Sequence, residues 1–191
     1  MQIEIKQVDR PAPPCATAAN VERTWPEEGN SRIPFWVYSD PEVYRLEKER
    51  IFLGPNWSYV ALECEIPNAG DYKRSFVGDM PIVVVRDTDG SVNAFANSCA
   101  HRGVAFCQSD SGNAKSFTCP HHHWSYDLKG NVTGLPFKRG YKGKGGMPKD
   151  FDVSEHRARP LAVTVRNGAV FASFDPSVES FEDYMGPNML Q

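Results

Sequence analysis

Two cysteines and two histidines near the middle of the chain have the residue types and the spacing of a metal centre. Cys99-x-His101 is followed, after 17 residues, by Cys119-x-x-His122. Thiolates bind iron–sulfur clusters, and imidazoles can replace two of them on one iron. Because each half-motif supplies one Cys and one His, the sequence predicts a [2Fe–2S] cluster with both cysteines on one iron and both histidines on the other. Such a cluster lacks two anionic ligands, so it has a raised potential, and it passes single electrons.

A zinc site of the Cys₂His₂ type is the main competing interpretation of these four residues. Zinc motifs usually place two Cys in one knuckle and two His, or two more Cys, in the other. The mixed order found here is unusual for zinc. Chance clustering is a weak explanation, because the chain has only five Cys and five His. A visible spectrum separates the two kinds of site, since an iron–sulfur cluster absorbs visible light and zinc does not.

Three consecutive histidines, His121, His122 and His123, leave the register of the second half-motif open. A chelate through His121 is also feasible. We prefer His122, because one extra residue lets the loop turn and bring this imidazole beside that of His101. In that register His121 and His123 are loop residues or neighbours of the ligands.

Short strands separated by turn signals must position these loops. Alternating or β-branched segments are each ended by Gly, Pro, Asn or Asp, a pattern that predicts antiparallel strands and a mostly β fold. Both half-motifs follow a predicted strand. The predicted strands are 57–66, 72–77, 82–86, 92–96, 116–118, 125–128, 132–134, 161–165 and 169–174.

Two helical segments and one long loop complete the pattern. Asp40 can cap, and Gly54 can end, the one clear helix, which we predict over 40–53. A short helical segment begins at Ser180. Residues 135–150 contain four glycines and two prolines, so they are predicted to form a long surface loop.

Composition limits the class of protein. The chain has 191 residues and a net charge of −3 with acids and bases interspersed, so we expect no nucleic-acid partner. No apolar run is long enough to cross a bilayer, and the first ten residues lack the apolar stretch of a secretory signal. Five cysteines without disulfide-scaffold spacing indicate a reducing, cytoplasmic compartment. We expect no role for Cys15 and Cys64, and a packed thiol at Cys107.

The residues around the four candidates resemble a known family. Cys-x-His-Arg-Gly at 99–103 and Cys-Pro-x-His-x-Trp at 119–124 resemble the large (alpha) subunit of Rieske non-haem iron aromatic-ring-hydroxylating oxygenases. The similarity covers 25–191 and is greatest to subunits of the salicylate 5-hydroxylase type, near terephthalate, anthranilate and halobenzoate dioxygenases. The segments outside the motif that carry it are 25–29, 32–36, 65–71, 82–87, 145–151 and 178–187.

The resemblance implies a Rieske [2Fe–2S] fold of antiparallel sheets, with an N-terminal helix and a short C-terminal helical segment. It divides the chain into an N-terminal arm (1–30), a helical leader (31–56), the Rieske [2Fe–2S] domain (57–175) and the start of a catalytic domain (176–191). We expect that catalytic domain to lie beyond this sequence. In the family it holds a mononuclear Fe(II) that activates O₂ and binds the aromatic acid.

The resemblance also implies a route for electrons. A reductase fed by NAD(P)H reduces the cluster directly or through a ferredoxin, and the cluster then passes the electron to a catalytic iron in a neighbouring subunit. Full-length subunits form homo-oligomers, as rings of three alpha subunits, or alpha–beta hetero-oligomers. The expected function is electron transfer for O₂-dependent hydroxylation of a benzoate-like, salicylate-like aromatic acid. A free-standing Rieske ferredoxin is the alternative, although the long leader with its helix argues against it.

Two departures from the family pattern lie beside the motif. The family often has Tyr where His121 stands, and Gly, Ala or Gln where His123 stands, so extra imidazoles could tune the potential or its pH response. Respiratory Rieske proteins join two further loop cysteines in a disulfide. The corresponding positions here are Val104 and His121, so the resemblance implies no such bridge.

Overall fold

The computed structural model describes residues 23–27 and 29–189 and separates the chain into two compact units, Met1–Arg45 and Leu46–Gln191. Most of the arm predicted over 1–30, with Cys15, lies outside the described residues. No helix in the described part of the chain has the length and apolar character needed to span a membrane.

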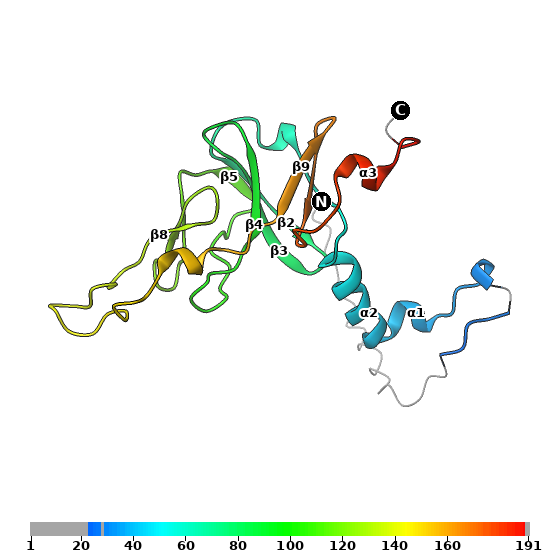
Figure 1. Cartoon of the computed structure of the whole chain (residues 1–191), viewed down its shortest axis with the longest axis horizontal. Helices are drawn as coiled ribbons and strands as arrows, with labels where there is room; N and C mark the ends of the chain where they lie inside the picture. Colours follow the sequence, from blue (N-terminus) through cyan, green and yellow to red (C-terminus); the bar gives the residue numbers. More distant parts are fainter. Residues whose placement is uncertain (1–22, 28, 190–191) are drawn as a thin grey trace, which may run out of the picture. The chain divides into compact units, whose positions relative to one another are not determined.

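The first unit contains a 3₁₀ turn, Gly29–Ser31, helix α1, Trp36–Ser39, and the start of helix α2, Pro41–Glu47 (Figure 1). The predicted cap at Asp40 is confirmed, because its carboxylate accepts a hydrogen bond from the Glu42 backbone N–H at 2.8 Å. That bond is the main reason that the pKa of Asp40 is lowered, and an ion pair with Arg23 lowers it further. A charged oxygen is therefore available to the free N–H groups of the first turn.

The predicted helix over 40–53 is present, but its second half is wider than an α-helix. After α2 the chain forms a π-helix, Lys48–Phe52, in which the Leu53 N–H donates to the Lys48 carbonyl at 2.9 Å. Gly54 then ends the helix as predicted: a Cβ there would lie 2.3 Å from the carbonyl oxygen of Arg50. No residue pattern in the sequence signals the change from α to π.

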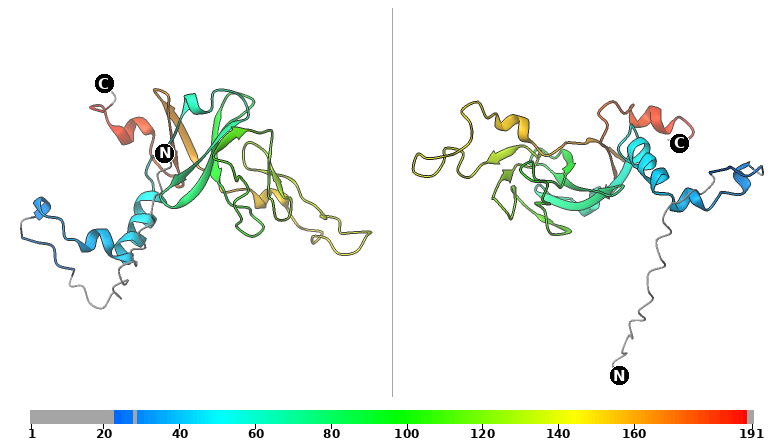
Figure 2. Two further views of the ribbon diagram at one scale, coloured as in Figure 1. Left: turned by 180° about the vertical axis from the view of Figure 1, so that it is seen from behind. Right: turned by 90° about the horizontal axis from the view of Figure 1, so that it is seen from below.

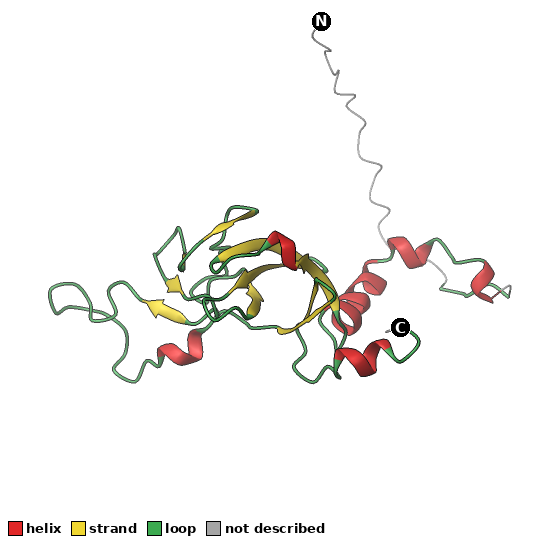
Figure 3. Cartoon of the chain, turned by 90° about the horizontal axis from the view of Figure 1, so that it is seen from above, coloured by secondary structure: helices red, strands yellow, loops and turns green. Residues whose placement is uncertain are grey.

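Three antiparallel sheets form the second unit, and Figure 3 shows their strands gathered in one body. The strand orders are β1-β10-β9, β4-β3-β2-β5 and β6-β7-β8. The mostly β, antiparallel fold predicted from the turn signals is confirmed. The strand bounds are β1 Ser58–Leu62, β2 Asp71–Val77, β3 Met80–Arg86, β4 Val92–Ala96, β5 Ser111–Asn113, β6 Phe117–Thr118, β7 Ser125–Tyr126, β8 Val132–Gly134, β9 Ala162–Arg166 and β10 Ala169–Ser173.

Besides the π-helix Lys48–Phe52, the second unit holds three short helical segments. They are the 3₁₀ turns Glu63–Glu65 and Val153–His156 and the helix α3, Phe181–Met185. Helix α3 starts where the sequence predicts, because the Ser180 hydroxyl accepts a hydrogen bond from the Asp183 N–H at 3.1 Å.

Strand β3 is buried on both faces and separates two apolar cores. Ile82 and Val84 belong to a core shared with β1, β9 and β10, while Val83 and Val85 belong to a second core. Successive side chains of a strand point to opposite faces, so this run of β-branched residues supplies both cores at once. The second core matters for function, because it also contains Cys99, Cys119, Trp124 and Tyr126.

Three parts of the strand prediction differ from the structure, the first being that the strand predicted over 125–128 ends at Tyr126. The strand predicted over 57–66 stops at Leu62, because the next three residues form a 3₁₀ turn. Strand β5, Ser111–Asn113, was not predicted, since it is short, polar and exposed and pairs only with Asp71–Lys73 of β2. The long loop over 135–150 is confirmed, and Figures 1 and 2 show it extending away from the strands after β8.

Candidate metal centre

Two loops with the same closure carry the four candidate ligands. The first loop (97–110) joins β4 to β5, and the second loop (119–124) joins β6 to β7. In the first, the Cys99 N–H donates to the Val104 carbonyl at 2.8 Å and the Gly103 N–H donates to the Cys99 carbonyl at 2.7 Å. In the second, Cys119 makes the equivalent pair of bonds with Trp124 at 2.8 Å and with His123 at 3.0 Å. The backbone therefore presents the two cysteines in matching turns.

The equivalence extends to the fourth residue after each cysteine. Gly103 has φ of +73° and His123 has φ of +58°, so both lie in the left-handed region. Glycine adopts this region freely, whereas a side chain there costs energy. The predicted departure at His123 thus falls on a position where the backbone favours glycine.

We expect His123→Gly to stabilise the chain by about 0.5–1 kcal/mol, because relief of the left-handed strain exceeds the entropy that glycine adds to the unfolded state. Gly103→Ala should destabilise it by about 1 kcal/mol, because alanine is strained at this positive φ. The added Cβ causes no clash, since its nearest neighbour is Ser98 Oγ at 3.8 Å. Urea unfolding of the cluster-loaded chain measures both changes. Gly168→Ala, at φ of +79° with open space around it, calibrates the backbone cost alone. A loss of stability in His123→Gly would show that the imidazole makes a stabilising contact.

The two preferred histidines lie side by side at the tips of these loops. The ring centroids of His101 and His122 are 4.6 Å apart and nearly perpendicular, and His101 stacks on Trp124 at 5.2 Å. His101 is half-buried and His122 is exposed. Desolvation lowers the pKa of His122, and the neighbouring imidazoles and Arg102 lower it further, which favours the neutral form that can bind a metal.

The two preferred cysteines lie beneath the histidines, in the second apolar core. Cys99 and Cys119 are 3% and 2% exposed. The hydroxyl of the fully buried Tyr126 donates to Cys99 Sγ at 3.1 Å and accepts from the Ala100 N–H at 3.0 Å. Burial raises the pKa of Tyr126 far above its usual range, and the bond to Cys99 raises it further, so the hydroxyl keeps its proton. Tyr126 is thus a fixed donor to a sulfur atom.

These residues fit a [2Fe–2S] cluster. His101 Nδ1 is one of two buried side-chain polar atoms in the described part that lack a hydrogen-bond partner, and bonding to an iron would satisfy it. Within residues 23–27 and 29–189, no group of three or more Cys, His, Asp or Glu side chains could hold a single metal ion. A Rieske-type cluster requires two protein ligands on each iron. The chain has a buried pair of thiols, Cys99 and Cys119, and a pair of adjacent imidazoles, His101 and His122.

We expect Tyr126→Phe to keep the cluster and lower its reduction potential. The hydroxyl stabilises negative charge on the Cys99 sulfur. Because the reduced cluster carries more negative charge than the oxidised cluster, this hydrogen bond favours the reduced form. A preference of about 1 kcal/mol for the reduced form corresponds to about 40 mV in a one-electron couple. Redox titration followed by visible absorbance measures the shift. Tyr72→Phe is the matched control, because the Tyr72 hydroxyl reaches the thiol of Cys107 instead. Equal potentials in Tyr126→Phe and the unsubstituted chain would rule out this role.

The two other cysteines of the described residues are Cys107, which is buried, and Cys64, which is exposed. Cys107 is buried, and its backbone is held by Asn97, which donates to its carbonyl at 2.8 Å and accepts from its N–H at 2.9 Å. Burial raises the pKa of the Cys107 thiol, so it stays protonated, as expected for a packed residue. Cys64 is exposed, and the four cysteines in the described residues are free.

Sequence reasoning missed Tyr126 and Asn97, the two polar residues that brace the loops from within the core. Tyr126 lies 27 residues from Cys99, and Asn97 lies 10 residues from Cys107. The sequence could have indicated only that strand alternation places a polar side chain in the core, where it needs a hydrogen-bond partner. It could not have identified that partner.

An open cavity of about 530 Å³ lies beside the imidazoles. One wall consists of the four histidines and Trp124, and the other consists of Pro136, Phe137 and Met147 from the long loop. The root of that loop therefore lies next to the exposed end of the candidate centre.

Comparisons with known proteins show which proteins the chain resembles. The Rieske [2Fe-2S] domain matches residues 56–170. The chain is 54% identical over 170 residues to the large oxygenase component of salicylate 5-hydroxylase from Ralstonia sp, covering 87% of this chain and 40% of that protein. It is 52% identical over 165 residues to the large subunit of anthranilate 1,2-dioxygenase from Burkholderia cepacia, covering 86% and 39%. The chain thus spans about 40% of the length of these relatives.

Solved structures show the same likeness in three dimensions. Naphthalene 1,2-dioxygenase from Rhodococcus sp. bound to indole superposes with a TM-score of 0.71 at 35% identity, over 81% of this chain and 34% of that one. The quaternary ammonium Rieske monooxygenase CntA in complex with gamma-butyrobetaine superposes with a TM-score of 0.69 at 31% identity, over 79% and 41%.

Proposed function

Because the chain belongs to the Rieske [2Fe–2S] domain family, we propose that Cys99 and Cys119 hold one iron of the cluster and that His101 and His122 hold the other. The observation that carries this assignment is the imidazole pair, 4.6 Å apart, with a buried and unpartnered Nδ1 on His101. A cluster with these ligands supplies one-electron chemistry at a raised potential.

The surrounding residues prepare the site for that role. Tyr126 donates to one thiolate and stabilises its negative charge. Trp124, 4% exposed, stacks on His101 and covers the inner side of the imidazole pair from water. His122 is exposed, so electrons enter and leave at this tip. The chain thus insulates the sulfur side of the centre and opens the imidazole side.

We further propose that the chain is the N-terminal part of the large subunit of an aromatic-ring-hydroxylating oxygenase. Similarity to the salicylate and anthranilate relatives covers 165–170 residues, whereas the Rieske domain match covers only 56–170. The additional similarity favours an oxygenase subunit over a free-standing Rieske ferredoxin. In this assignment, 1–30 is an arm, 31–56 a leader, 57–175 the electron-transfer domain and 176–191 the start of the catalytic domain.

The partners and substrate follow from the same assignment. The relatives named as a salicylate 5-hydroxylase and an anthranilate 1,2-dioxygenase favour a benzoate-like acid as substrate. The proposed electron source is NAD(P)H through a reductase, with or without a ferredoxin, in the cytoplasm. The proposed acceptor is a mononuclear Fe(II) in the catalytic domain, within a homo-oligomer or an alpha–beta hetero-oligomer.

We expect these 191 residues alone to accept electrons but to hydroxylate nothing. An oxygenase iron of this class needs two His and one carboxylate on one face. Outside the loop that holds His121 to His123, the chain has His101 and His156. His156 Nδ1 is 2.9 Å from the Asp152 carbonyl oxygen, and its ring packs on Phe151 at 4.3 Å, so it is part of the structure around the loops.

The test combines the cluster-loaded chain with an NADH-dependent reductase, ferrous iron, O₂ and salicylate. Reduction of the cluster, seen by loss of visible absorbance, should occur without hydroxylated product. A chain extended by its catalytic domain serves as the positive control. Product formed at catalytic turnover and coupled to NADH use by the 191 residues alone would overturn the assignment of roles. A chain that binds zinc and shows no visible absorbance would overturn the cluster itself.

A further inference from the structure

One loop of this acidic chain is strongly basic. The chain has 21 Lys and Arg against 24 Asp and Glu, yet residues 136–149, which we call the basic loop, contain five basic residues and no acid. All five are exposed, and none forms an ion pair with a residue of the described chain. The five are Lys138, Arg139, Lys142, Lys144 and Lys149. This surface therefore carries positive charge that no ion pair within the described chain neutralises, although Lys138 also interacts electrostatically with Asp152.

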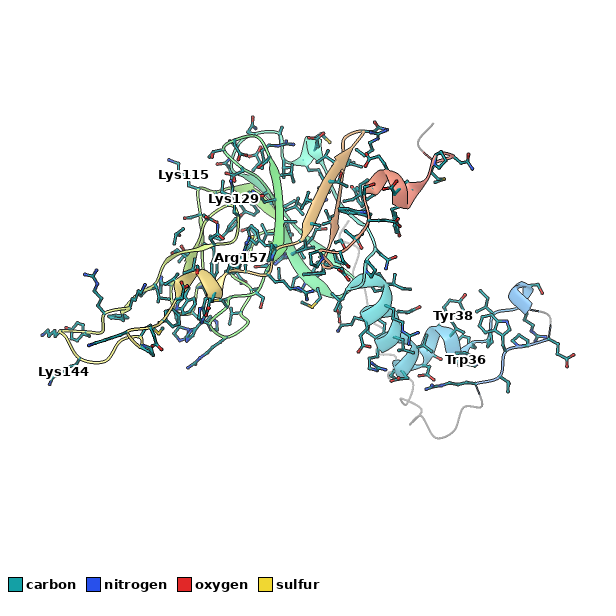
Figure 4. All side chains as sticks on the ribbon, in the orientation of Figure 1. Trp36, Tyr38, Lys115, Lys129, Lys144 and Arg157 are labelled. Carbon is teal, nitrogen blue, oxygen red and sulfur yellow. The ribbon has the colours of Figure 1, made fainter. Side chains whose placement is uncertain are left out.

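The basic loop is held in a defined shape by its own backbone. The Gly140 N–H donates to the Phe137 carbonyl at 2.7 Å, the Met147 N–H donates to the Lys138 carbonyl at 3.0 Å, and Tyr141 and Lys144 exchange two hydrogen bonds. A Cβ at Gly140 would lie 2.3 Å from the Lys144 carbonyl oxygen, so only glycine permits this approach. The charges are thus displayed on a cross-linked loop, and Figure 4 places Lys144 near its outer end.

The same loop presents two aromatic rings to solvent. Phe137 and Tyr141 are 70% and 65% exposed, with ring centroids 6.5 Å apart. Phe137 has φ of +58°, a conformation that is costly for a residue with a side chain. Phe137 also lines the cavity beside the imidazoles, so the aromatic pair joins the basic surface to the exposed end of the cluster site. Aromatic residues are enriched at the centre of protein interfaces, whereas polar and charged residues surround them at the rim.

We propose that the basic loop is the docking surface for an acidic one-electron donor protein, with Phe137 and Tyr141 as its apolar anchors. This inference rests on the proposed function, since it assumes that the cluster is reduced at the His101–His122 tip. In the docked complex one electron leaves the reduced donor and one is gained by this chain, so the donor returns to its oxidised form.

Charge complementarity selects an acidic donor over a second copy of this chain. Isologous contact between two basic loops would place like charges together, which is unfavourable. An acidic donor is attracted instead, and the field of five cations raises the rate of its encounter at the place where electrons enter. Electron transfer weakens steeply with distance, so a donor gains most by docking next to the exposed imidazole of His122.

The experiment measures binding of an oxidised, acidic plant-type [2Fe–2S] ferredoxin to the cluster-loaded 191-residue chain by calorimetry at several salt concentrations. Binding should weaken as salt rises. Lys144→Glu should raise the dissociation constant roughly fivefold at low salt, and the difference should vanish at high salt. Lys115→Glu is the matched control, because Lys115 is also exposed but is carried on another part of the domain (Figure 4). It should bind like the unsubstituted chain.

A second variant tests the aromatic anchor separately from charge. Phe137→Gly removes the ring and keeps the left-handed backbone, so the loop still closes. It should weaken ferredoxin binding roughly tenfold at every salt concentration. Stopped-flow reduction of the cluster by reduced ferredoxin should slow in both loop variants, whereas the extent of reduction by dithionite should stay complete.

Each other outcome counts against the docking surface. Equal weakening by Lys144→Glu and Lys115→Glu would mean that only net charge matters. Unchanged binding in both loop variants would place the donor elsewhere. A change of oligomeric state in Lys144→Glu would assign the loop to contact between copies of this chain. Failure of dithionite to reduce any cluster would instead overturn the proposed function, which the binding measurement on its own does not address.

Discussion

Replacing Cys119 by alanine should leave the chain without its cluster. The thiolate is one of only two anionic ligands that the proposed site offers, and imidazoles alone do not hold an iron–sulfur cluster. Cys99→Ala should have the same effect. Iron content should fall from about two atoms per chain to near zero, and the visible absorbance should disappear. Iron analysis and a visible spectrum of the purified chains measure the result.

Cys107→Ala is the matched control for both substitutions. Cys107 is 4% exposed and packs in the same core as Cys99 and Cys119, so its loss removes a buried sulfur of equal size. It should keep full iron content and lose only about 1–2 kcal/mol of stability. Circular dichroism of each variant is compared with the unsubstituted chain after removal of its iron, so that unfolding is not mistaken for loss of a ligand. Retention of a normal cluster by Cys119→Ala would show that the ligand set is wrong.

His122→Ala should abolish the Rieske EPR signal, whereas His121→Ala should retain it. The ring centroid of His122 is 4.6 Å from that of His101. The ring centroid of His121 is 6.1 Å from that of His122, and in the described residues the ring of His101 contacts neither His121 nor His123. Only one imidazole of the second loop is thus placed beside His101. His122→Cys should allow a cluster to form with three thiolates, and its potential should fall by as much as a few hundred mV toward that of an all-cysteine cluster.

His123→Ala is the second control in this series, since His123 flanks the same ligand position from the other side. It should keep the EPR signal. The opposite pattern, loss of the signal in His121→Ala and retention in His122→Ala, would move the ligand by one residue. Equal partial loss in both would mean that the two imidazoles exchange at the iron.

The sequence by itself determined the chemistry of the site and most of the strands around it. Cys and His at a mixed spacing define a donor set with few rivals, because thiolate and imidazole are uncommon together outside metal centres. Strands β3 and β4 were predictable because they are rich in apolar residues and successive side chains enter the two cores alternately. Strand β5 was not, because Ser111–Asn113 has no apolar side chain and exists only where β2 lies beside it.

Tertiary structure decided what the sequence left open at the candidate centre. The order of His121, His122 and His123 did not fix which ring faces His101, because that depends on how the second loop closes on Cys119. The donor to Cys99 is Tyr126, from a strand that follows the other loop. The His101–His122 ring pair and the Tyr126–Cys99 bond each join segments far apart along the chain. Local sequence limits the conformations that each segment can adopt, but only burial in a common core selects the conformations that fit together.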